Sequence, residues 1–317
     1  MLKIVILDGH TLNPGDISWS ALEALGDVQI YPRTAPELLL ERAGTAEVLV
    51  VNKQVLDATT IANLPKLQFI AVSATGYNNV DIAAANQRGI PVANVAGYST
   101  PAVAQHVFAL ILAMTSRIGA HNQSVQAGDW SKSPDFAYTL GVIPELSTLT
   151  LGIYGLGRIG QAVAKVGLAH GMQVLAHHKH PKRDAMEGVT FVSLPELFQR
   201  SNIVSLHAPL NQDNEEIVGR QLLSTMPKPS YLINTGRGGL INEQELAVCL
   251  KENIITAAGL DVLQQEPPPA DHPLIGIPNC IVTPHIAWAT QAARQRLMQE
   301  VVLNIKAFVA GDDRNRV

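Results

Sequence analysis

The sequence predicts an α/β fold in which helices alternate with buried parallel strands along the whole chain. Short apolar runs rich in Val, Ile and Leu recur from one end to the other. Each run is continuous, which is typical of strands buried on both faces. Segments with helical spacing lie between these runs, and this alternation favours parallel sheets. With 317 residues, of which 47% are hydrophobic and 16% charged, the chain is long enough to fold as two such domains.

The expected strands are the continuous apolar runs, at residues 2–8, 47–52, 67–73, 91–95, 149–155, 173–178, 203–207, 231–235, 257–262 and 280–283. The expected helices lie between them, at residues 18–25, 100–114, 159–170, 194–199 and 242–252, with a last helix at about 291–309. The helix from Thr100 to about Ile118 is apolar on several faces, which predicts burial at a domain or subunit interface. A polar, turn-rich stretch at 121–147 marks a boundary after it. Helical spacing alone leaves open which domain the last helix covers.

Composition and charge argue against several classes of protein. A net charge of −4 without a basic stripe argues against a nucleic-acid partner. No apolar run reaches the roughly 20 residues that span a bilayer. The apolar run at the amino terminus is too short for a signal peptide, so a cytoplasmic protein is expected. The two cysteines, Cys249 and Cys280, lack metal-ligand spacing, which predicts reduced thiols and no metal site.

A glycine-rich turn, Gly155-Leu-Gly-Arg-Ile-Gly160, stands between an expected buried strand and an expected helix. This context indicates a dinucleotide-binding turn. Gly155 would allow the tight turn, Gly157 would let a pyrophosphate approach the backbone, and Gly160 would let the helix pack closely on the sheet. The start of the helix would face the phosphates with its N–H groups and partial positive charge. A purely structural glycine turn is the alternative.

The strand after this turn ends in a basic segment, His177-His-Lys-His180. NAD-binding versions of the motif carry an Asp or Glu here for the ribose 2′-hydroxyl. No acid stands at His178, and Lys179 would attract a 2′-phosphate that an acid would repel. The sequence therefore favours NADP(H) over NAD(H), with both possible. A histidine metal site is the alternative, but successive side chains on a strand point to opposite faces.

Three polar segments follow later strands, at the sheet edge where open α/β folds place ligands. Arg237 lies among glycines in Asn234-Thr-Gly-Arg-Gly, and an Arg in an exposed loop can bind a carboxylate bidentately. Glu266 follows Gly259-Leu-Asp-Val, and His285 stands in Thr283-Pro-His-Ile-Ala. Taken singly, each could be a surface charge or a structural histidine, but together and in this order they favour a catalytic set.

These motifs, in register with the glycine turn, resemble those of the D-isomer-specific 2-hydroxyacid dehydrogenase family. The resemblance covers essentially the whole chain and is close to the glycerate dehydrogenase/hydroxypyruvate reductase branch. It implies two Rossmann/flavodoxin-like, doubly wound domains with parallel sheets and an active-site cleft between them. Residues 1–98 with 288–317 would form the substrate domain, which the last helix rejoins, and residues 99–287 the NAD(P)-binding domain. A homodimer joined through the helix at 100–118 and the arm at 121–147 is also implied.

The activity implied by the resemblance is NAD(P)-dependent interconversion of a small 2-keto acid, such as hydroxypyruvate or glyoxylate, and its 2-hydroxy acid. Ketone reduction needs a hydride on carbon, which the cofactor supplies, and a proton on oxygen. His285 would supply the proton, and Glu266 would orient the imidazole and favour its protonated form. Arg237 would hold the carboxylate and the keto oxygen beside the nicotinamide.

The resemblance also implies the remaining contacts. The substrate-binding residues would be Ala74, Thr75, Gly76, Arg237 and His285. The cofactor-binding residues would be Thr100, Gly155, Leu156, Gly157, Arg158, Ile159, Gly160, His178, Lys179, His207, Ala208, Pro209, Thr235, Gly236, Arg237, Asp261, His285 and Ala287. One departure from many relatives is Gln105, which stands where they carry a Glu and is expected to be structural.

One alternative belongs to another class of protein, and a second lies within the enzymes. A non-catalytic, nucleotide-sensing protein of the same fold, similar to the C-terminal-binding-protein corepressors, would keep the same Arg, Glu and His. This chain has no extra tail or basic region that would favour that role. Formate and phosphite dehydrogenases share the architecture as well. Spacing does not identify the side chains that face the substrate's R group, so glyoxylate, hydroxypyruvate and longer keto acids all stay open.

Overall fold

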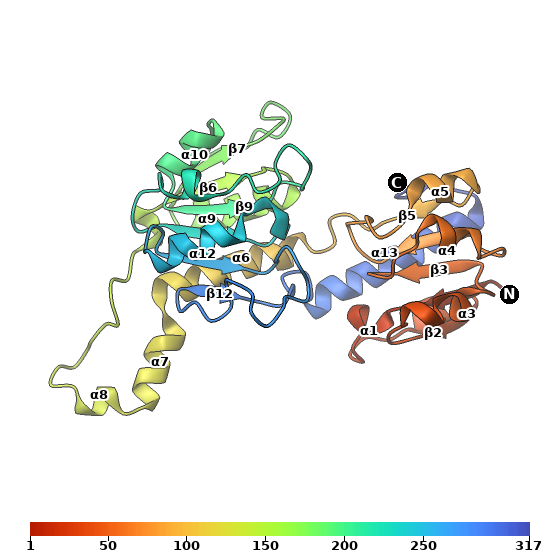
Figure 1. The fold of residues 1–317 in the computed structure, drawn as a ribbon, viewed down its shortest axis with the longest axis horizontal. Coiled ribbons are helices and arrows are strands. Elements are labelled where there is room, and N and C mark those ends of the chain that lie inside the picture. The colour runs from red at the N-terminus through yellow and green to blue at the C-terminus, as the bar shows by residue number, and fades with distance from the viewer. The chain divides into compact units, whose positions relative to one another are not determined.

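A computed structural model describes residues 1–317 and divides the chain into two compact units. Unit 1 comprises Met1–Ser99 and Ala289–Val317, and unit 2 comprises Thr100–Trp288. Each unit contains one sheet whose strands all pair in parallel. The expected α/β class with two parallel sheets is therefore confirmed (Figure 1).

Unit 1 is built on a five-stranded sheet in the order β2-β1-β3-β4-β5, whose direction of winding reverses between β1 and β3. Its strands are β1 (Lys3–Ile6), β2 (Asp27–Ile30), β3 (Val48–Val51), β4 (Phe69–Val72) and β5 (Val92–Ala93). Its helices are α1 (Gly9–Leu12), α2 (Ser20–Glu23), the 3-10 turn η1 (Pro36–Leu38), α3 (Leu39–Ala43), α4 (Ala58–Ala62), α5 (Ile82–Gln87) and α13 (Gln291–Ala310). The last helix packs on this sheet, because Phe308 stacks on Phe69 with ring centroids 4.7 Å apart.

The carboxylate of Asp8 closes the reversal point of the unit 1 sheet. Asp8 lies just after β1 and is buried. It accepts the backbone N–H groups of Asn52, Lys53 and Gln54, just after β3, at 2.6–3.0 Å. N–H groups at such a point commonly face a ligand in open α/β sheets. In unit 1 these N–H groups donate to the Asp8 carboxylate instead. The reversal point of this sheet therefore stabilises the fold.

Unit 2 is built on a seven-stranded sheet in the order β12-β11-β10-β9-β6-β7-β8, with the reversal between β6 and β9. Its strands are β6 (Thr150–Tyr154), β7 (Gln173–His177), β8 (Val189–Phe191), β9 (Ile203–Leu206), β10 (Tyr231–Asn234), β11 (Ala257–Leu260) and β12 (Cys280–Val282). Its helices are α6 (Thr100–Ser116), α7 (Ile118–Gln126), α8 (Asp129–Lys132), η2 (Leu146–Thr148), α9 (Arg158–Ala169), α10 (Leu194–Arg200), α11 (Arg220–Leu223), η3 (Gly238–Leu240) and α12 (Glu243–Lys251).

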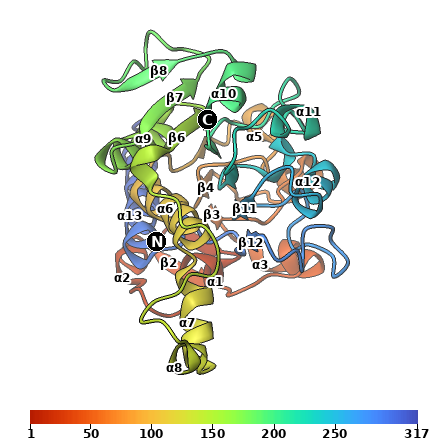
Figure 2. The same ribbon diagram turned by 90° about the vertical axis from the view of Figure 1, so that its left-hand side faces the viewer.

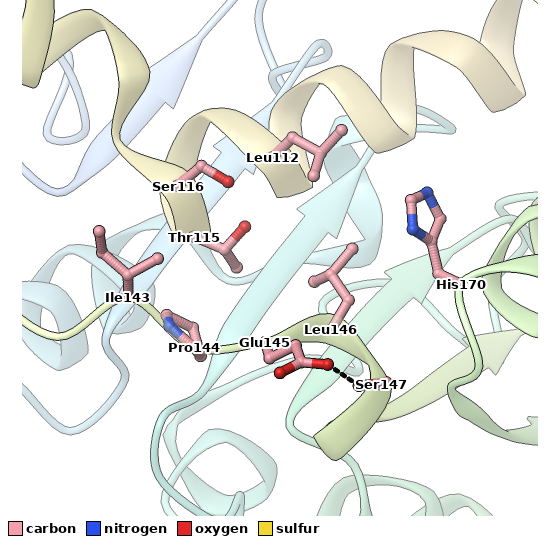
Figure 3. Close-up of a pocket in the computed structure, with 9 residues that line it drawn as sticks. All are labelled: Leu112, Thr115, Ser116, Ile143, Pro144, Glu145, Leu146, Ser147 and His170. Atoms are coloured by element: carbon pink, nitrogen blue, oxygen red, sulfur yellow. Dashed lines mark hydrogen bonds between the residues drawn. The ribbon is translucent and has the colours of Figure 1, made fainter.

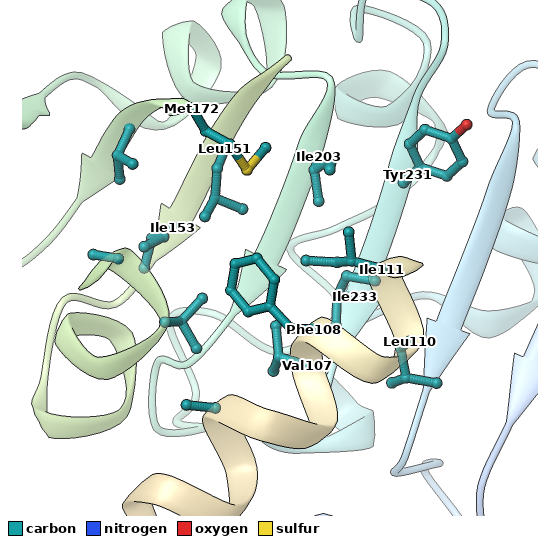
Figure 4. Close-up of a cluster of buried hydrophobic side chains, with 14 of the residues drawn as sticks. Val107, Phe108, Leu110, Ile111, Leu151, Ile153, Met172, Ile203, Tyr231 and Ile233 are labelled. Carbon is teal, nitrogen blue, oxygen red and sulfur yellow. The ribbon is translucent and has the colours of Figure 1, made fainter. Parts of the chain in front are cut away.

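Helix α6 supplies much of the core of unit 2. Val107, Phe108 and Ile111 are buried and point toward strand side chains such as Ile203 and Ile233 (Figure 4). Burying a side chain of this size contributes roughly 1.5–3 kcal/mol relative to leaving it exposed. The buried apolar side chains of α6 thus cover the sheet of its own unit.

Two strands, β2 and β8, lie outside the expected set, and both are edge strands. Their residues alternate between half-buried and exposed, so no continuous apolar run marks them in the sequence. The helix expected at 18–25 is a single turn, Ser20–Glu23. The chain turns into β2 directly after it, and a Cβ on Gly26 would lie 2.1 Å from the Leu2 carbonyl oxygen.

The stretch at 121–147, expected to be turn-rich, begins inside a helix. Arg117 has a left-handed φ of 50°, which interrupts the helix between α6 and α7. Helices α7 and α8 then project from the rest of unit 2 as an arm, and the chain returns along residues 133–147 (Figures 1 and 2). No single helix is long and apolar enough to cross a membrane, and α6 with α7 would qualify only as a pair bent by 53°.

Candidate active site

Glu266 and His285 form a hydrogen-bonded contact at the carboxyl edge of the unit 2 sheet. Glu266 follows β11 and His285 follows the neighbouring strand β12. The His285 Nδ1 and Glu266 Oε2 atoms are 2.6 Å apart, and the two side chains are 29% and 34% exposed. Glu266 Oε1 also accepts the N–H of Leu263 at 3.1 Å, which holds the carboxylate in place. Pairing through Nδ1 leaves Nε2 as the ring nitrogen that can face a substrate.

The backbone at His285 adopts a rare conformation that the surrounding structure maintains. Its φ is 55°, in the left-handed region that non-glycine residues seldom adopt. Asp261, which is buried, accepts the N–H groups of Ile286 (2.9 Å) and Ala287 (2.8 Å). Its Oδ1 also accepts the hydroxyl of Thr283 at 2.5 Å. The Asp261 carboxylate therefore binds the loop through residues on both sides of His285.

Asp261 was expected to bind the cofactor. In the structure both of its oxygens accept hydrogen bonds from the His285 loop. His106, on α6, joins the same group, with its Nε2 atom 3.0 Å from the Thr283 hydroxyl and 3.5 Å from Asp261 Oδ1. Spacing gave no role to Thr283 or His106, because their partners lie 22 and 177 residues away in sequence.

Arg237 lies just beyond β10, the neighbour of β11, in a loop that Asn234 holds. The fully buried Asn234 side chain donates from Nδ2 to the Arg237 carbonyl at 2.8 Å, and its Oδ1 accepts the N–H of Gly236 at 3.0 Å. A Cβ on Gly238 would lie 2.0 Å from the carbonyl carbon of Leu263, so the Arg237 loop touches the start of the Glu266 loop. The role of Asn234 was not predicted, although an Asn before a Gly turn is a signal for it.

The glycine turn lies where expected, between β6 and α9, and its three glycines differ in their surroundings. A Cβ on Gly155 would lie 2.5 Å from the Ala208 nitrogen, and one on Gly160 would lie 2.2 Å from the Gly155 oxygen. A Cβ on Gly157 would meet nothing within 4 Å. The Thr235 hydroxyl, in the loop after β10, is buried without a hydrogen-bond partner. Open space at the start of α9 and an unpartnered hydroxyl both fit a phosphate-bearing nucleotide.

The end of β7 differs from the bare basic segment that was expected, because an acid folds back onto it. Asp184 Oδ2 lies 2.6 Å from His178 Nε2, and Arg183 pairs with the same carboxylate at 2.6 Å. Hydrogen bonds from Arg183 and His178 lower the pKa of Asp184 to about 2. This acid stands six residues beyond His178, where the motif's spacing does not place it. The segment therefore carries a carboxylate as well as the exposed Lys179.

The hydrogen bonds of His178 fix its tautomer. The N–H of Leu156, in the glycine turn, donates to His178 Nδ1 at 3.1 Å. The ring proton is therefore on Nε2, from which it is donated to Asp184. His178 thus links the glycine turn to the Asp184 segment, and both of its ring nitrogens are engaged within the protein.

His207 lies in the loop after β9, against the glycine turn. Burial lowers the pKa of its imidazole to about 4, so the ring is neutral at pH 7. Its Nε2 atom lies 2.8 Å from the buried Ser205 hydroxyl. The neighbouring Ala208 packs on Gly155, and Pro209 is exposed.

The other expected cofactor contacts fall on several elements of unit 2. Thr100 is the first residue of α6 and is half-buried. Arg158 and Ile159 open α9 after the N-cap Gly157, and Ala287 is buried in the loop that Asp261 holds.

The expected substrate loop, Ala74–Gly76, belongs to unit 1 and follows β4. The Ala74 carbonyl accepts the N–H of Val95 at 2.9 Å, and the Thr75 hydroxyl donates to the Val95 carbonyl at 2.9 Å. Asn94 Nδ2 donates to the Thr75 carbonyl at 2.7 Å. The segment after β5 therefore holds this loop.

A cavity of about 430 Å³ lies in unit 2, away from the residues described above (Figure 3). It is lined by Leu112 and Thr115 of α6, by residues 143–147 and by His170. No group of three or more His, Cys, Asp or Glu side chains is placed to hold a metal ion.

Comparison with known proteins places these features in a family. The family described as D-isomer specific 2-hydroxyacid dehydrogenase, NAD binding domain, matches residues 108–287. A hydroxypyruvate reductase of Blautia hydrogenotrophica is 41% identical, over 100% of this chain and 99% of its own length. A glycerate dehydrogenase of Methylorubrum extorquens is 39% identical, over 99% of this chain and 98% of its own length. Among solved structures, an acyclic imino acid reductase in complex with NADPH and D-Arg is similar over the full length of both chains, with a TM-score of 0.87 and 31% identity.

The resemblance inferred from the motifs is confirmed by the full-length matches. The relatives are named as enzymes, which does not favour the corepressor-like alternative. The chain belongs to the D-isomer specific 2-hydroxyacid dehydrogenase family, in its glycerate dehydrogenase/hydroxypyruvate reductase branch, and is an NAD(P)-dependent oxidoreductase that acts on the CH–OH group of its donors.

Proposed function

We propose that this enzyme reduces a small 2-keto acid, such as hydroxypyruvate or glyoxylate, with Glu266 and His285 as the acid–base pair and Arg237 as the carboxylate anchor. The observation that carries the proposal is the 2.6 Å contact between Glu266 and His285. The three residues follow β11, β12 and β10, which are neighbours in one parallel sheet, so their loops leave the same edge.

The roles follow from the chemistry of the side chains. A nicotinamide cofactor, when bound, supplies the hydride. His285 donates the proton to the keto oxygen from Nε2, because Nδ1 faces Glu266. The Glu266 carboxylate orients the ring and favours its protonated form. Arg237 binds the substrate carboxylate through its planar guanidinium, and backbone N–H groups of Ala74, Thr75 and Gly76 bind the same group.

NADP(H) is the favoured cofactor in this proposal, with NAD(H) also possible. Support comes from the imidazole of His178 at the end of β7, where NAD-binding versions of the motif carry an acid, and from the adjacent cations Lys179 and Arg183. Asp184 works against it, although its charge is partly offset by Arg183. The predicted consequence is that Asp184→Asn increases the ratio of kcat/KM with NADPH to kcat/KM with NADH.

A homodimer joined through α6 and the arm is also proposed. The arm exposes large apolar side chains, including Phe136 (92%), Val142 (86%) and Ile118 (68%). Exposed apolar side chains gathered on one segment are typical of protein–protein interfaces. Light scattering should give the mass of a dimer for the wild type and a smaller mass for Phe136→Asp.

The experiment that tests the proposed function is a panel of 2-keto acids, including glyoxylate and hydroxypyruvate, assayed with NADPH and with NADH. The expected result is reduction of the small keto acids, with the higher kcat/KM for NADPH. A strong preference for NADH would overturn the cofactor assignment alone. Inactivity on every 2-keto acid would overturn the proposed reaction.

A further inference from the structure

A second Glu–His pair, buried and unused by the proposed mechanism, lies in unit 2. Glu243 Oε2 and His272 Nε2 are 2.9 Å apart, and the residues are 8% and 7% exposed. The pair joins the first residue of α12 to a residue 29 positions later in the sequence. Burying two ionisable groups is costly unless their polar atoms are satisfied, so the other contacts of the pair show what it holds.

Each polar atom of the pair has a defined partner. His272 Nδ1 accepts the N–H of Leu274 at 3.3 Å, so the ring proton is on Nε2 and is donated to Glu243. The other carboxylate oxygen, Glu243 Oε1, accepts the N–H of Gln264 at 2.9 Å. Glu243 stands in the first turn of α12, where the helix dipole favours a negative charge. One carboxylate therefore ties residue 264 to residue 272.

We call Glu243 and His272, with the Gln264 N–H that Glu243 accepts, the clamp. The loop between residues 264 and 272, whose ends the clamp joins, carries Glu266. Residues 264–271 are all exposed, so packing against a core does little to fix them. The cavity beside the clamp, of about 430 Å³, is also lined by two further acids, Glu216 and Glu245. The side chain of Gln264 adds two hydrogen bonds that fix the start of this loop. Its Nε2 donates to Glu216 Oε1 and to the Ile241 carbonyl, both at 2.9 Å.

The backbone held by the clamp also packs closely against the Arg237 loop. A Cβ on Gly238 would lie 2.3 Å from the Gln264 nitrogen, the atom whose N–H Glu243 accepts. Any shift of residue 264 would therefore move against the backbone next to Arg237. Catalytic geometry tolerates little displacement, since misplacement by about 1 Å can cost a hundredfold in rate.

We propose that Glu243 and His272 are positioning residues for the reaction: their buried pair closes the exposed loop and holds Glu266 against His285. The inference rests on the proposed roles of Glu266 and His285. Neither Glu243 nor His272 touches the reacting atoms. Their effect passes through Gln264 and through the loop they close.

The test is a rate–pH profile of keto-acid reduction by Glu243→Gln. An amide cannot replace the carboxylate at both contacts: its oxygen can accept from Gln264, but its NH₂ group then meets the N–H of His272. If Glu266 moves away from His285, the protonated imidazole loses the carboxylate next to it. The high-pH limb of kcat should then move to lower pH, as in Glu266→Gln, with a loss of kcat of about tenfold or more and little change in the KM for NADPH.

The matched control is Glu245→Gln, two residues away on α12. Glu245 carries the same charge and accepts a backbone N–H, from Arg220 at 2.6 Å, but has no hydrogen bond to the 264–272 loop. This variant should keep the wild-type pH profile. In a Glu266→Gln background, Glu243→Gln should add little further change, because the residue it positions is already altered.

His272 gives a second route if the Glu243 variant is poorly folded. His272→Gln keeps a donor near the Nε2 position and should stay close to the wild type, whereas His272→Leu should shift the high-pH limb. A lowered melting temperature with an unmoved limb in Glu243→Gln, or in His272→Leu, would show a merely structural pair and overturn the inference. That outcome is distinct from failure of the proposed function, in which the wild type itself is inactive on every 2-keto acid.

Discussion

Replacement of Glu266 by Gln removes the charge that supports His285, while Gln keeps an oxygen that can accept the N–H of Leu263. The contacting atoms are 2.6 Å apart, and about a third of each side chain is exposed. Two unit charges about 4 Å apart interact by about 1 kcal/mol in water and about 4 kcal/mol at an effective dielectric of about 20. Exposure places this pair at the lower end, at about 1 kcal/mol or less.

That free energy converts into a shift of the rate–pH profile. The high-pH limb of keto-acid reduction should move to lower pH in Glu266→Gln. The direction follows from the mechanism: the protonated imidazole donates the proton, and removing the neighbouring anion disfavours that form. Steady-state rates at saturating keto acid and NADPH, followed by nicotinamide absorbance, measure the shift. A limb that stays in place in a folded variant that still binds cofactor would refute the assignment of Glu266.

Three further outcomes follow from the geometry. Gly160→Ala should lower the melting temperature, because its Cβ would lie 2.2 Å from a backbone oxygen, whereas Gly157→Ala should melt near the wild type but bind cofactor more weakly; equal melting temperatures for the two would contradict this. The lowered pKa of His207, about 4 against 6.5, means that the unfolded chain binds the extra proton between these values, so stability is lost as pH falls through this window. His207→Asn should flatten that part of the melting-temperature profile, and an unchanged slope would count against it. Asp8→Ala should reduce the free energy of unfolding by at least about 2 kcal/mol, since it leaves the N–H groups of residues 52–54 without their acceptor; an unchanged urea midpoint would show that they find other partners.

The sequence predicts the parts of this enzyme that local pattern controls. Continuous apolar runs identify strands buried on both faces, and Arg237, Glu266 and His285 are predicted as catalytic residues because each stands soon after such a run. Edge strands β2 and β8 lack that signal, since exposed residues alternate with half-buried ones along both strands. Helix α7 was missed because its residues are polar and no buried stripe marks it.

Contacts across long sequence separations could not be read from spacing. Asp184 reaches His178 only because the segment after β7 folds back, and Glu243 meets His272 only when α12 and the loop after β11 are in place. Asn234 and Asp261 stand in the recognised motifs, yet their roles emerge from the backbone groups that they bind. The sequence thus predicts which side chains would carry the chemistry, and the structure shows which side chains hold their loops.

The central claim, that His285 paired with Glu266 donates the proton in 2-keto acid reduction, is tested most directly by His285→Ala. The measurement is kcat for hydroxypyruvate and glyoxylate, with cofactor affinity determined in parallel by nicotinamide fluorescence. The account predicts a loss of kcat of at least ~100-fold, the typical share of general acid catalysis, with cofactor binding retained. Near-normal turnover in this variant would contradict it.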